Sequence, residues 1–472
     1  MPEARRRNVK LAAVLDETSW SHAQLAMAFV RVAIEHGARE LAGVGRSHVS
    51  HWVGGTQPSG RAPELLCETL SRRLKRVVTP QEIGLAATSD SPGPVDWCAD
   101  TLVTLAELGS ADVDMERRRA LGTAVYSAAA LVLPGDAWWQ RMAERGSRRS
   151  VPGARRVGRG DVEAVRDMVS AFSRLDQRRG GGHARTAVVQ YLVSDVAGYL
   201  TGRYGDDGVR RQMFSAASEL AYLSGWMAFD NAEHPVAQRY FSLAVKLAAE
   251  ADDAPMAGHV LRAMAHQAVD LGHARGALEL SAAAVEGRRY TEATPRERAL
   301  TGVVHARGLA VTGQRAAAAA ALLRAEDDLA SARPGDEEPG RVFFFQEASL
   351  AHQTACTLRD SGDLKGAAGQ FRRSVRTRKA SAFTRTHALT LGNLGSVQVR
   401  QGDFEEARRT WSQALDAMDG VRSGRTRQTA RDIRAGLVPF RKRGVREAAE
   451  LDARAAAYLD ESVPVERAGR LP

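Results

Sequence analysis

The chain has 472 residues, enough for about three ordinary domains, and carries 66 Lys and Arg against 56 Asp and Glu, a net charge of +10. Its 44% hydrophobic content excludes wholesale disorder. The low aromatic content of 6%, with Ala, Leu and Arg abundant, favours helix over sheet. No apolar run is long enough to span a membrane, and Cys67, Cys98 and Cys356 lie too far apart for a disulfide framework. We therefore expect an all-α, cytoplasmic protein.

The first predicted domain covers residues 1–88 and contains five short helices. Asn8 opens the first, Ser19 or Ser21 caps the second, and a third runs over residues 46–53 between pairs of glycines. Pro63 begins the fourth, and Thr79 caps a short fifth. The second and third helices together predict a helix-turn-helix.

The third helix has the composition of a recognition helix, with Val49, Trp52 and Val53 facing inward. Small polar donors on a short helix can enter the major groove and reach base edges. The predicted DNA-contacting residues are Arg46, Ser47, His48, Ser50, His51, Gln57 and Arg61. A solvated helix face is the plain alternative for this polar surface.

Two further features of this domain leave alternatives open. Arg72, Arg73, Lys75 and Arg76 either contact phosphates or only complement a helix C-terminus. Residues 32–44 form an insertion before the third helix, so the second helix is longer than usual or a loop bulges.

The next predicted segments are a helical connector over residues 95–140 and a basic linker over residues 141–160. The linker holds seven Arg with Gly, Ser and Pro, and we expect it to be flexible.

Residues 161–460 show a repeated pattern that predicts a solenoid of helix pairs similar to tetratricopeptide (TPR) repeats. The strongest copy has Gly395 and Ala407 where two helices approach closely, Gly402 in the turn, and Phe404 and Trp411 in the seam. Turn glycines recur at 272, 313, 362 and 402, with spacings longer than the usual 34 residues. A degenerate copy includes Gly225 and Phe241. After about residue 420 the pattern fades.

The first helices of such pairs line a groove that binds peptides or proteins. The groove residues predicted here are Gln267, His305, His352, Gln353, Asn393 and Gln398. Basic clusters at residues 372–379 and 421–446 are either solvated faces or contacts to DNA flanks or an acidic partner.

The sequence supports no cofactor, metal or catalytic site. His48 and His51 have a chelating spacing but lack further ligands nearby, and no phosphate-binding or nucleophile motif occurs. None of the cysteines has a neighbouring histidine suggesting a nucleophile. His259, His266 and His273 are expected to be core or cap residues. Residues 180–182 form a plain loop, or else an anion site.

Several segments together resemble actinobacterial, Streptomyces-type TPR-containing transcriptional regulators, whose N-terminal domain is similar to the Cro/repressor-type (XRE-like) helix-turn-helix. The resemblance lies in residues 11–15 with 20–21, 51–58, 70–80 with 84–85, 138–139, 180–185, 223–228 and 305–309. It implies control of development or antibiotic biosynthesis, often as a repressor, with dimerisation through the solenoid and a small peptide as switch.

We therefore expect a sequence-specific DNA-binding regulator associated with the nucleoid, acting on a double-stranded operator as a homodimer. A peptide, small molecule or protein effector would bind the solenoid groove. The alternative is a TPR interaction scaffold whose helix-turn-helix has lost specific DNA binding, since residues 1–90 carry only twelve Lys and Arg against nine Asp and Glu. An enzyme is a third reading, disfavoured by the absence of a catalytic constellation.

Overall fold

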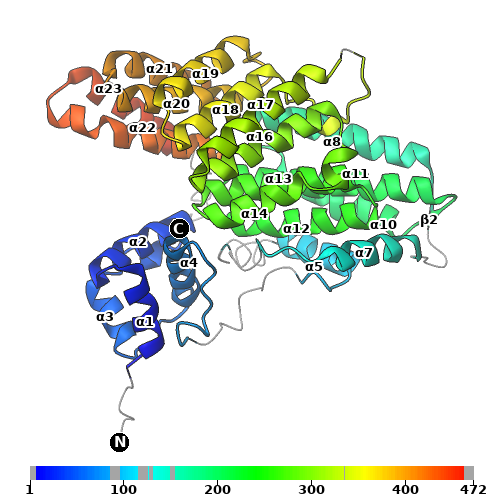
Figure 1. The fold of residues 1–472 in the computed structure, drawn as a ribbon, viewed down its shortest axis with the longest axis horizontal. Coiled ribbons are helices and arrows are strands. Elements are labelled where there is room, and N and C mark those ends of the chain that lie inside the picture. Colours follow the sequence, from blue (N-terminus) through cyan, green and yellow to red (C-terminus); the bar gives the residue numbers. More distant parts are fainter. Residues whose placement is uncertain are drawn as a thin grey trace, which may run out of the picture. The chain divides into compact units, whose positions relative to one another are not determined.

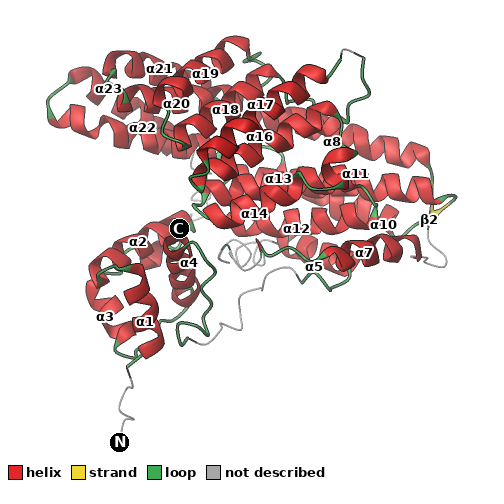
Figure 2. Cartoon of the chain, in the orientation of Figure 1, coloured by secondary structure: helices red, strands yellow, loops and turns green. Residues whose placement is uncertain are grey.

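The computed structural model describes residues 7–85, 96–114, 126, 131–148, 155–333 and 335–461 (Figure 1). Within these ranges the fold is all-α, as the composition predicts (Figure 2). The described strands, β1 (Arg156–Val157) and β2 (Arg203–Tyr204), form one short parallel pair. No helix in these ranges is long and apolar enough to cross a membrane. The chain forms two compact units, residues 1–166 with 186–292, and residues 167–185 with 293–472.

The first unit opens with short helices that share one buried core. They are α1 (Val9–Thr18), α2 (His22–Glu35), the 3-10 turn η1 (Arg39–Leu41), α3 (Arg46–Val53) and α4 (Ala62–Leu74). Asn8 caps α1, and Ser21 with Gln24 forms a capping box at α2. The fifth helix expected at Thr79 is instead a turn at residues 80–84.

The predicted connector packs against a repeat helix of the same unit. Its helices α5 (Thr101–Val113) and α7 (Asp136–Arg148) both contact α12 (His234–Glu250). The ammonium of the fully buried Lys246 on α12 donates to the carbonyl oxygens of Asp96 and Ala99, at 3.0 and 2.8 Å, and to Thr104 Oγ1 at 3.2 Å. Lys246 therefore connects the start of α5 to α12 through three hydrogen bonds.

The prediction of a flexible linker over residues 141–160 is wrong wherever the structure describes it. Helix α7 continues to Arg148, with Trp138 and Met142 buried one turn apart and Arg141 and Arg145 exposed, as on an amphipathic helix. Beyond it, Val157 is buried in β1, which pairs with β2. Residues 149–154 lie outside the described ranges.

The remaining helices of the first unit precede or build helix pairs. They are α8 (Arg159–Arg179), whose second half belongs to the other unit, α9 (Arg185–Tyr191), the π-turn η3 (Leu192–Val196), α10 (Ala197–Leu200), α11 (Asp207–Asp230) paired with α12, α13 (Ala254–Asp270) paired with α14 (Ala274–Ala284), and α15 (Arg288–Thr291).

The second unit is a stack of helix pairs. The pairs are α16 (Pro295–Val311) with α17 (Arg315–Ser331), α18 (Glu347–Asp360) with α19 (Leu364–Thr377), α20 (Thr384–Arg400) with α21 (Phe404–Ala417), and α22 (Gly424–Lys442) with α23 (Arg446–Glu461). Successive pairs also contact one another, through α16 and α18, α19 and α20, and α20 and α22. This is the solenoid-like arrangement predicted from the repeated pattern.

The predicted turn glycines all lie between the two helices of a pair. Gly272, Gly313, Gly362 and Gly402 have φ angles of 82°, 83°, 92° and 89°, in the left-handed region that glycine enters without a steric penalty. Ala232 holds the equivalent place between α11 and α12 with φ 64°, which explains why that copy looks degenerate in sequence.

Segments inserted between successive helix pairs account for the long spacings between these glycines. The helices on either side of each glycine are 11 to 17 residues long. The longest interval contains residues 332–346 between α17 and α18, including the 3-10 turn η4 (Gly340–Val342). There Val342 and Phe345 are fully buried, and Arg341 pairs with Glu297 at 2.7 Å. Another interval contains α15.

The strongest predicted repeat has the seam that its residues indicate. A Cβ at Gly395 would lie only 2.4 Å from Trp411 Cδ1, so the small residue lets the indole lie against α20. The Trp411 Nε1 donates to the carbonyl oxygen of Gly392 at 3.1 Å. Gly225 meets the ring of Phe241 in the same way between α11 and α12.

The array extends beyond the point where the sequence pattern fades. Helices α22 and α23 form a further pair, joined at Gly444 with φ 77°, and bury Ile433, Leu437 and Leu451. Helix α22 runs to Lys442 and accommodates Pro439. The many arginines of this segment make its stripe of buried apolar residues hard to recognise in the sequence.

Candidate nucleic-acid interface

Helix α3 packs against α2 through the three apolar residues predicted to face inward. Val49, Trp52 and Val53 are buried, and the Trp52 ring meets Phe29 of α2 edge-on at a centroid distance of 5.3 Å. The backbone N–H of Asn8 donates to the Val53 carbonyl oxygen at 2.9 Å, which ties the end of α3 to the start of α1. The helix is therefore held rigidly from one side.

The opposite side of α3 carries the predicted contact residues, and all of them are exposed. They are Arg46, Ser47, His48, Ser50 and His51. His48 has a local role as well, because its Nδ1 accepts from the Gly45 backbone N–H at 3.2 Å and caps the helix. In the described part of the chain the other four side chains have no hydrogen-bond or ion-pair partner. One face of α3 therefore presents polar side chains that make no hydrogen bond within the described chain.

The insertion before α3 is accommodated both by a longer second helix and by an extended connection, the two possibilities expected from the sequence. Helix α2 extends to Glu35, and the remaining residues make a turn at Gly37, with φ 70°, followed by η1. Ala38 is completely buried in this connection. The path from α2 to α3 is therefore longer than a tight helix-turn-helix turn but packed into the core.

The two predicted contacts past the Gly-Gly turn differ. Gln57 is exposed. Arg61 is half-buried, and its Nη2 donates to the carbonyl oxygen of His36 at 3.0 Å, so it caps the end of α2. Burial lowers the pKa of Arg61. Gln57 and Arg61 both stay predicted DNA contacts, and one guanidinium nitrogen of Arg61 is engaged within the domain.

The basic end of α4 is used within the protein. Arg72 pairs with Glu68 and Glu35, and Arg73 donates twice to the Thr18 carbonyl oxygen, at 3.1 and 3.0 Å. Arg76 pairs with Glu17 and Glu82, each at 2.6 Å. These contacts favour the structural alternative for three members of the cluster. Lys75 is exposed and has no such partner in the described chain.

One of the six predicted groove residues belongs to the first unit and is structural. Gln267 on α13 is 1% exposed and donates through Nε2 to the His234 carbonyl oxygen at 2.9 Å. The other five lie on α16, α18 and α20 of the second unit.

The five residues of the second unit divide between the core and a polar row. His352 and Gln398 are buried within the repeats, and His305 and Gln353 are half-buried. Asn393 accepts from Arg359 Nη1 at 2.6 Å and donates to the Leu389 carbonyl oxygen. His352 and Gln398 therefore do not form a solvent-facing groove surface.

Sequence reasoning missed the charged residues that surround Asn393. Arg359 also contacts Asp360, and Asp360 accepts from Arg307 Nε at 2.9 Å, so a polar row crosses α16, α18 and α20. Asp176, at the end of α8, accepts from the guanidinium of the buried Arg385 at 2.8 Å through both oxygens. Neither could be found from spacing, because each joins separate helices.

The expectation for cysteine needs one correction. His352 precedes Cys356 by one helical turn, and its Nε2 lies 3.7 Å from the sulfur, while its Nδ1 lies 2.9 Å from Thr390 Oγ1. Both Cys356 and His352 are buried, and the His352 ring packs edge-on against Phe371. This pair is part of the repeat core. Among the described residues no group of His, Cys, Asp or Glu has the arrangement of a metal site.

Comparison with known proteins bears on the N-terminal helices. Residues 11–86 match a family model described as the SP15 N-terminal domain. The match begins inside α1 and ends just after the turn that follows α4, so it coincides with the core built by these helices. No curated protein and no solved structure matches the chain.

Proposed function

We propose that this protein is a sequence-specific DNA-binding regulator of transcription whose N-terminal helices read an operator through α3. The observation that carries the proposal is the exposed face of α3, with Arg46, Ser47, Ser50 and His51 uncommitted while the opposite face is buried against α2. Arginine and small hydroxyl side chains on a short, rigidly held helix suit contacts to base edges and phosphates.

The helix pairs supply the second part of the proposal, a sensing region. Stacked helix pairs present an extended surface that binds peptides, proteins or small molecules. By resemblance to the Streptomyces-type regulators, we further propose that the protein acts as a homodimer at the nucleoid and represses genes of development or secondary metabolism. A ligand that prefers one state of the helix pairs would then shift the balance between DNA-bound and free forms.

The test begins with genome-fragment selection by the purified full-length protein. Fluorescence anisotropy on the recovered sites then compares wild type with the double variant Arg46→Ala/His48→Ala. Lys365→Ala is the matched control, because Lys365 is also exposed but lies on α19, outside the predicted DNA-contacting residues. We expect a recovered inverted repeat bound at nanomolar concentrations and lost in the double variant only.

Salt dependence separates this proposal from the scaffold alternative. A regulator gives sequence-dependent affinity that also falls steeply with salt, because phosphate contacts release counterions. Weak, sequence-blind binding that is equal in the double variant and wild type would overturn the proposal. The helix pairs would then be the functional region, with protein partners as their ligands.

A further inference from the structure

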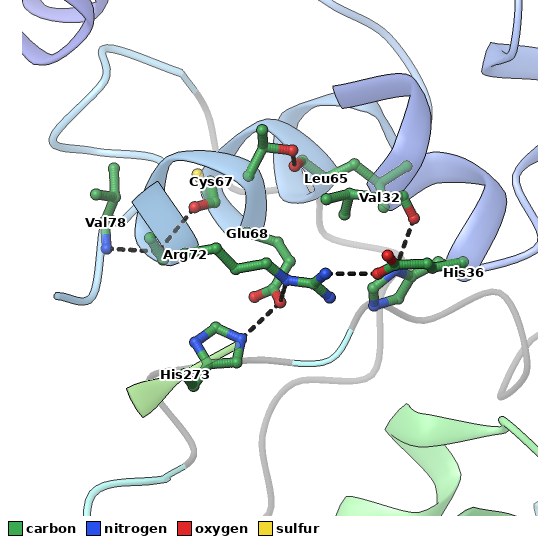
Figure 3. A network of polar contacts seen from close by, with 11 residues as sticks. Val32, His36, Leu65, Cys67, Glu68, Arg72, Val78 and His273 are labelled. Atoms are coloured by element: carbon green, nitrogen blue, oxygen red, sulfur yellow. Dashed lines mark hydrogen bonds and ion pairs between the residues drawn. The ribbon is translucent and has the colours of Figure 1, made fainter. Parts of the chain in front are cut away.

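The carboxylate of Glu68 on α4 joins the N-terminal helices to a repeat turn of the same unit. Glu68 is almost completely buried and accepts from Arg72 Nε at 2.8 Å and from His273 Nε2 at 2.7 Å (Figure 3). His273 is the N-cap residue of α14, next to the turn glycine at 272, and lies 205 positions along the chain from Glu68. The expected cap role of His273 is thus combined with a long-range contact.

The charges around Glu68 keep it ionised in spite of its burial. Burial alone would raise the pKa of Glu68, but the facing His273 and Arg72 lower it. Arg72 is in turn held by Glu35. His36 lies beside this pair, with Nδ1 donating to the Val32 carbonyl oxygen at 2.8 Å, and burial lowers its pKa. Removing either Arg72 or His273 would leave the buried carboxylate with too few partners, which is strongly destabilising.

Two residues of the connector lie against the start of α14, where His273 makes this contact. The Tyr126 ring lies over His273 at a centroid distance of 5.3 Å, and Tyr126 is 1% exposed. Leu131 covers Gly276, where a Cβ would lie 2.6 Å from Leu131 Cδ1. The Tyr126 hydroxyl has no hydrogen-bond partner within the described chain. The buried Tyr126 ring shields the His273 side of the contact from water, and a hydrogen bond to a carboxylate is stronger where water is excluded.

We propose that Glu68, Arg72 and His273, with Tyr126 as cover, form a latch whose closure sets the affinity of α3 for DNA. The proposal rests on the proposed function and adds its regulation. The exposed face of α3 takes no part in the latch, so the closed state is compatible with DNA binding. Opening the latch frees the N-terminal helices from the α13–α14 turn. The orientation of α3 relative to the turn then varies, and a smaller fraction of molecules is competent to bind.

Hydrogen exchange on the full-length chain tests whether the latch exists. His273→Ala removes one partner, and Tyr126→Ala removes the cover. Tyr126→Phe is the matched control, because it retains the ring and removes only a hydroxyl without a partner. We expect amide exchange at least about tenfold faster in α4 and in the first turn of α14 for both alanine variants, since these segments would open locally. Tyr126→Phe should match wild type, and exchange in α18–α21 should be unchanged in every variant.

Operator binding by the same variants tests whether the latch regulates. If the competent fraction falls to about one fifth, the apparent Kd rises about fivefold in the two alanine variants. Tyr126→Phe should keep the wild-type Kd. Unchanged exchange in the alanine variants would overturn the latch. Faster exchange with an unchanged Kd would overturn its regulatory role while leaving the proposed function intact. Absence of specific binding by wild type would instead overturn the proposed function, together with the regulatory role, and the exchange result would still report on the contact.

Discussion

The exposed face of α3 and the basic end of α4 look alike in sequence, since both are short helical stretches that carry arginine among polar residues. In the structure they differ completely. The acceptors for Arg72, Arg73 and Arg76 are carboxylates and a carbonyl oxygen from α1, α2, α4 itself and the turn after α4, whereas Arg46 has no partner in the described chain. A cationic run is therefore available to a ligand only where the fold places no acceptor beside it.

Among substitutions that test this difference between α3 and α4, we expect the largest effect on stability at Arg72. We expect Arg72→Ala to lower the free energy of unfolding of the N-terminal helices by about 3–5 kcal/mol, because it leaves Glu68 buried with one partner fewer. Hydrogen-exchange protection of α2 and α4 measures this. Lys75→Ala, at an exposed site on the same helix end, should change protection by less than about 0.5 kcal/mol. Equal effects of the two substitutions would refute the structural role of the buried pair.

The second effect is at Arg46, where we expect a substitution to change DNA affinity and to leave stability nearly unchanged. Arg46→Ala should weaken operator binding by about 1–3 kcal/mol, the range for a good arginine contact to a base, and leave stability nearly unchanged. Anisotropy at two salt concentrations measures both the affinity and the salt slope. An Arg46→Ala protein that binds as tightly as wild type would show that α3 does not read DNA.

The third effect is a pH dependence that arises at the buried end of α2. The pKa of His36 is lowered from 6.5 by burial, so the unfolded state binds the proton more readily than the folded state. The stability contributed by neutral His36 is present above pH 6.5 and is lost as pH falls from 6.5 toward the folded-state pKa. The limiting slope is about 1.4 kcal/mol per pH unit. Thermal unfolding of wild type and His36→Gln between pH 7.5 and 5.5 measures it, and the variant should show the flatter profile.

The smallest expected effect on stability is at Arg76, and it compares an exposed arginine with the largely buried Arg72 near the same end of α4. Arg76 pairs with Glu17 and Glu82 at the surface, so Arg76→Ala should cost only about 0.2–1 kcal/mol. The loss should shrink further at 1 M salt, whereas the effect of Arg72→Ala should persist. A loss at Arg76 as large as that at Arg72 would mean that burial does not distinguish the two arginines.

Local pattern predicted much of this fold. The turn glycines, the small residue facing Trp411, and the inward side of α3 depend on neighbours within one or two helical turns, and each of these predictions is confirmed. The exposed positions of Arg46 and His51 followed from the same periodicity. Their binding to DNA stays a prediction.

Long-range pairing was beyond what spacing reveals. Arg61 reaches the carbonyl oxygen of His36, and Glu68 meets His273 across 205 positions, so neither contact leaves a local signature. The segment over residues 141–160 was misjudged for a related reason. Its arginines dominate the composition, while its burial rests on a few apolar residues such as Met142 on α7, the helix that packs against the repeat helix α12.

The buried Lys246 has a consequence for biosynthesis. Its acceptors at Asp96, Ala99 and Thr104 leave the ribosome 142–150 residues before the lysine does. At about 5–20 residues per second this interval is roughly 7–30 s. During that time the N-terminal helices can fold, but the start of α5 has no ammonium to bind and no α12 to cover it. The nascent chain therefore passes through a stage in which the connector, including Trp97 and Trp138, lacks the helix α12 against which α5 and α7 pack in the folded protein.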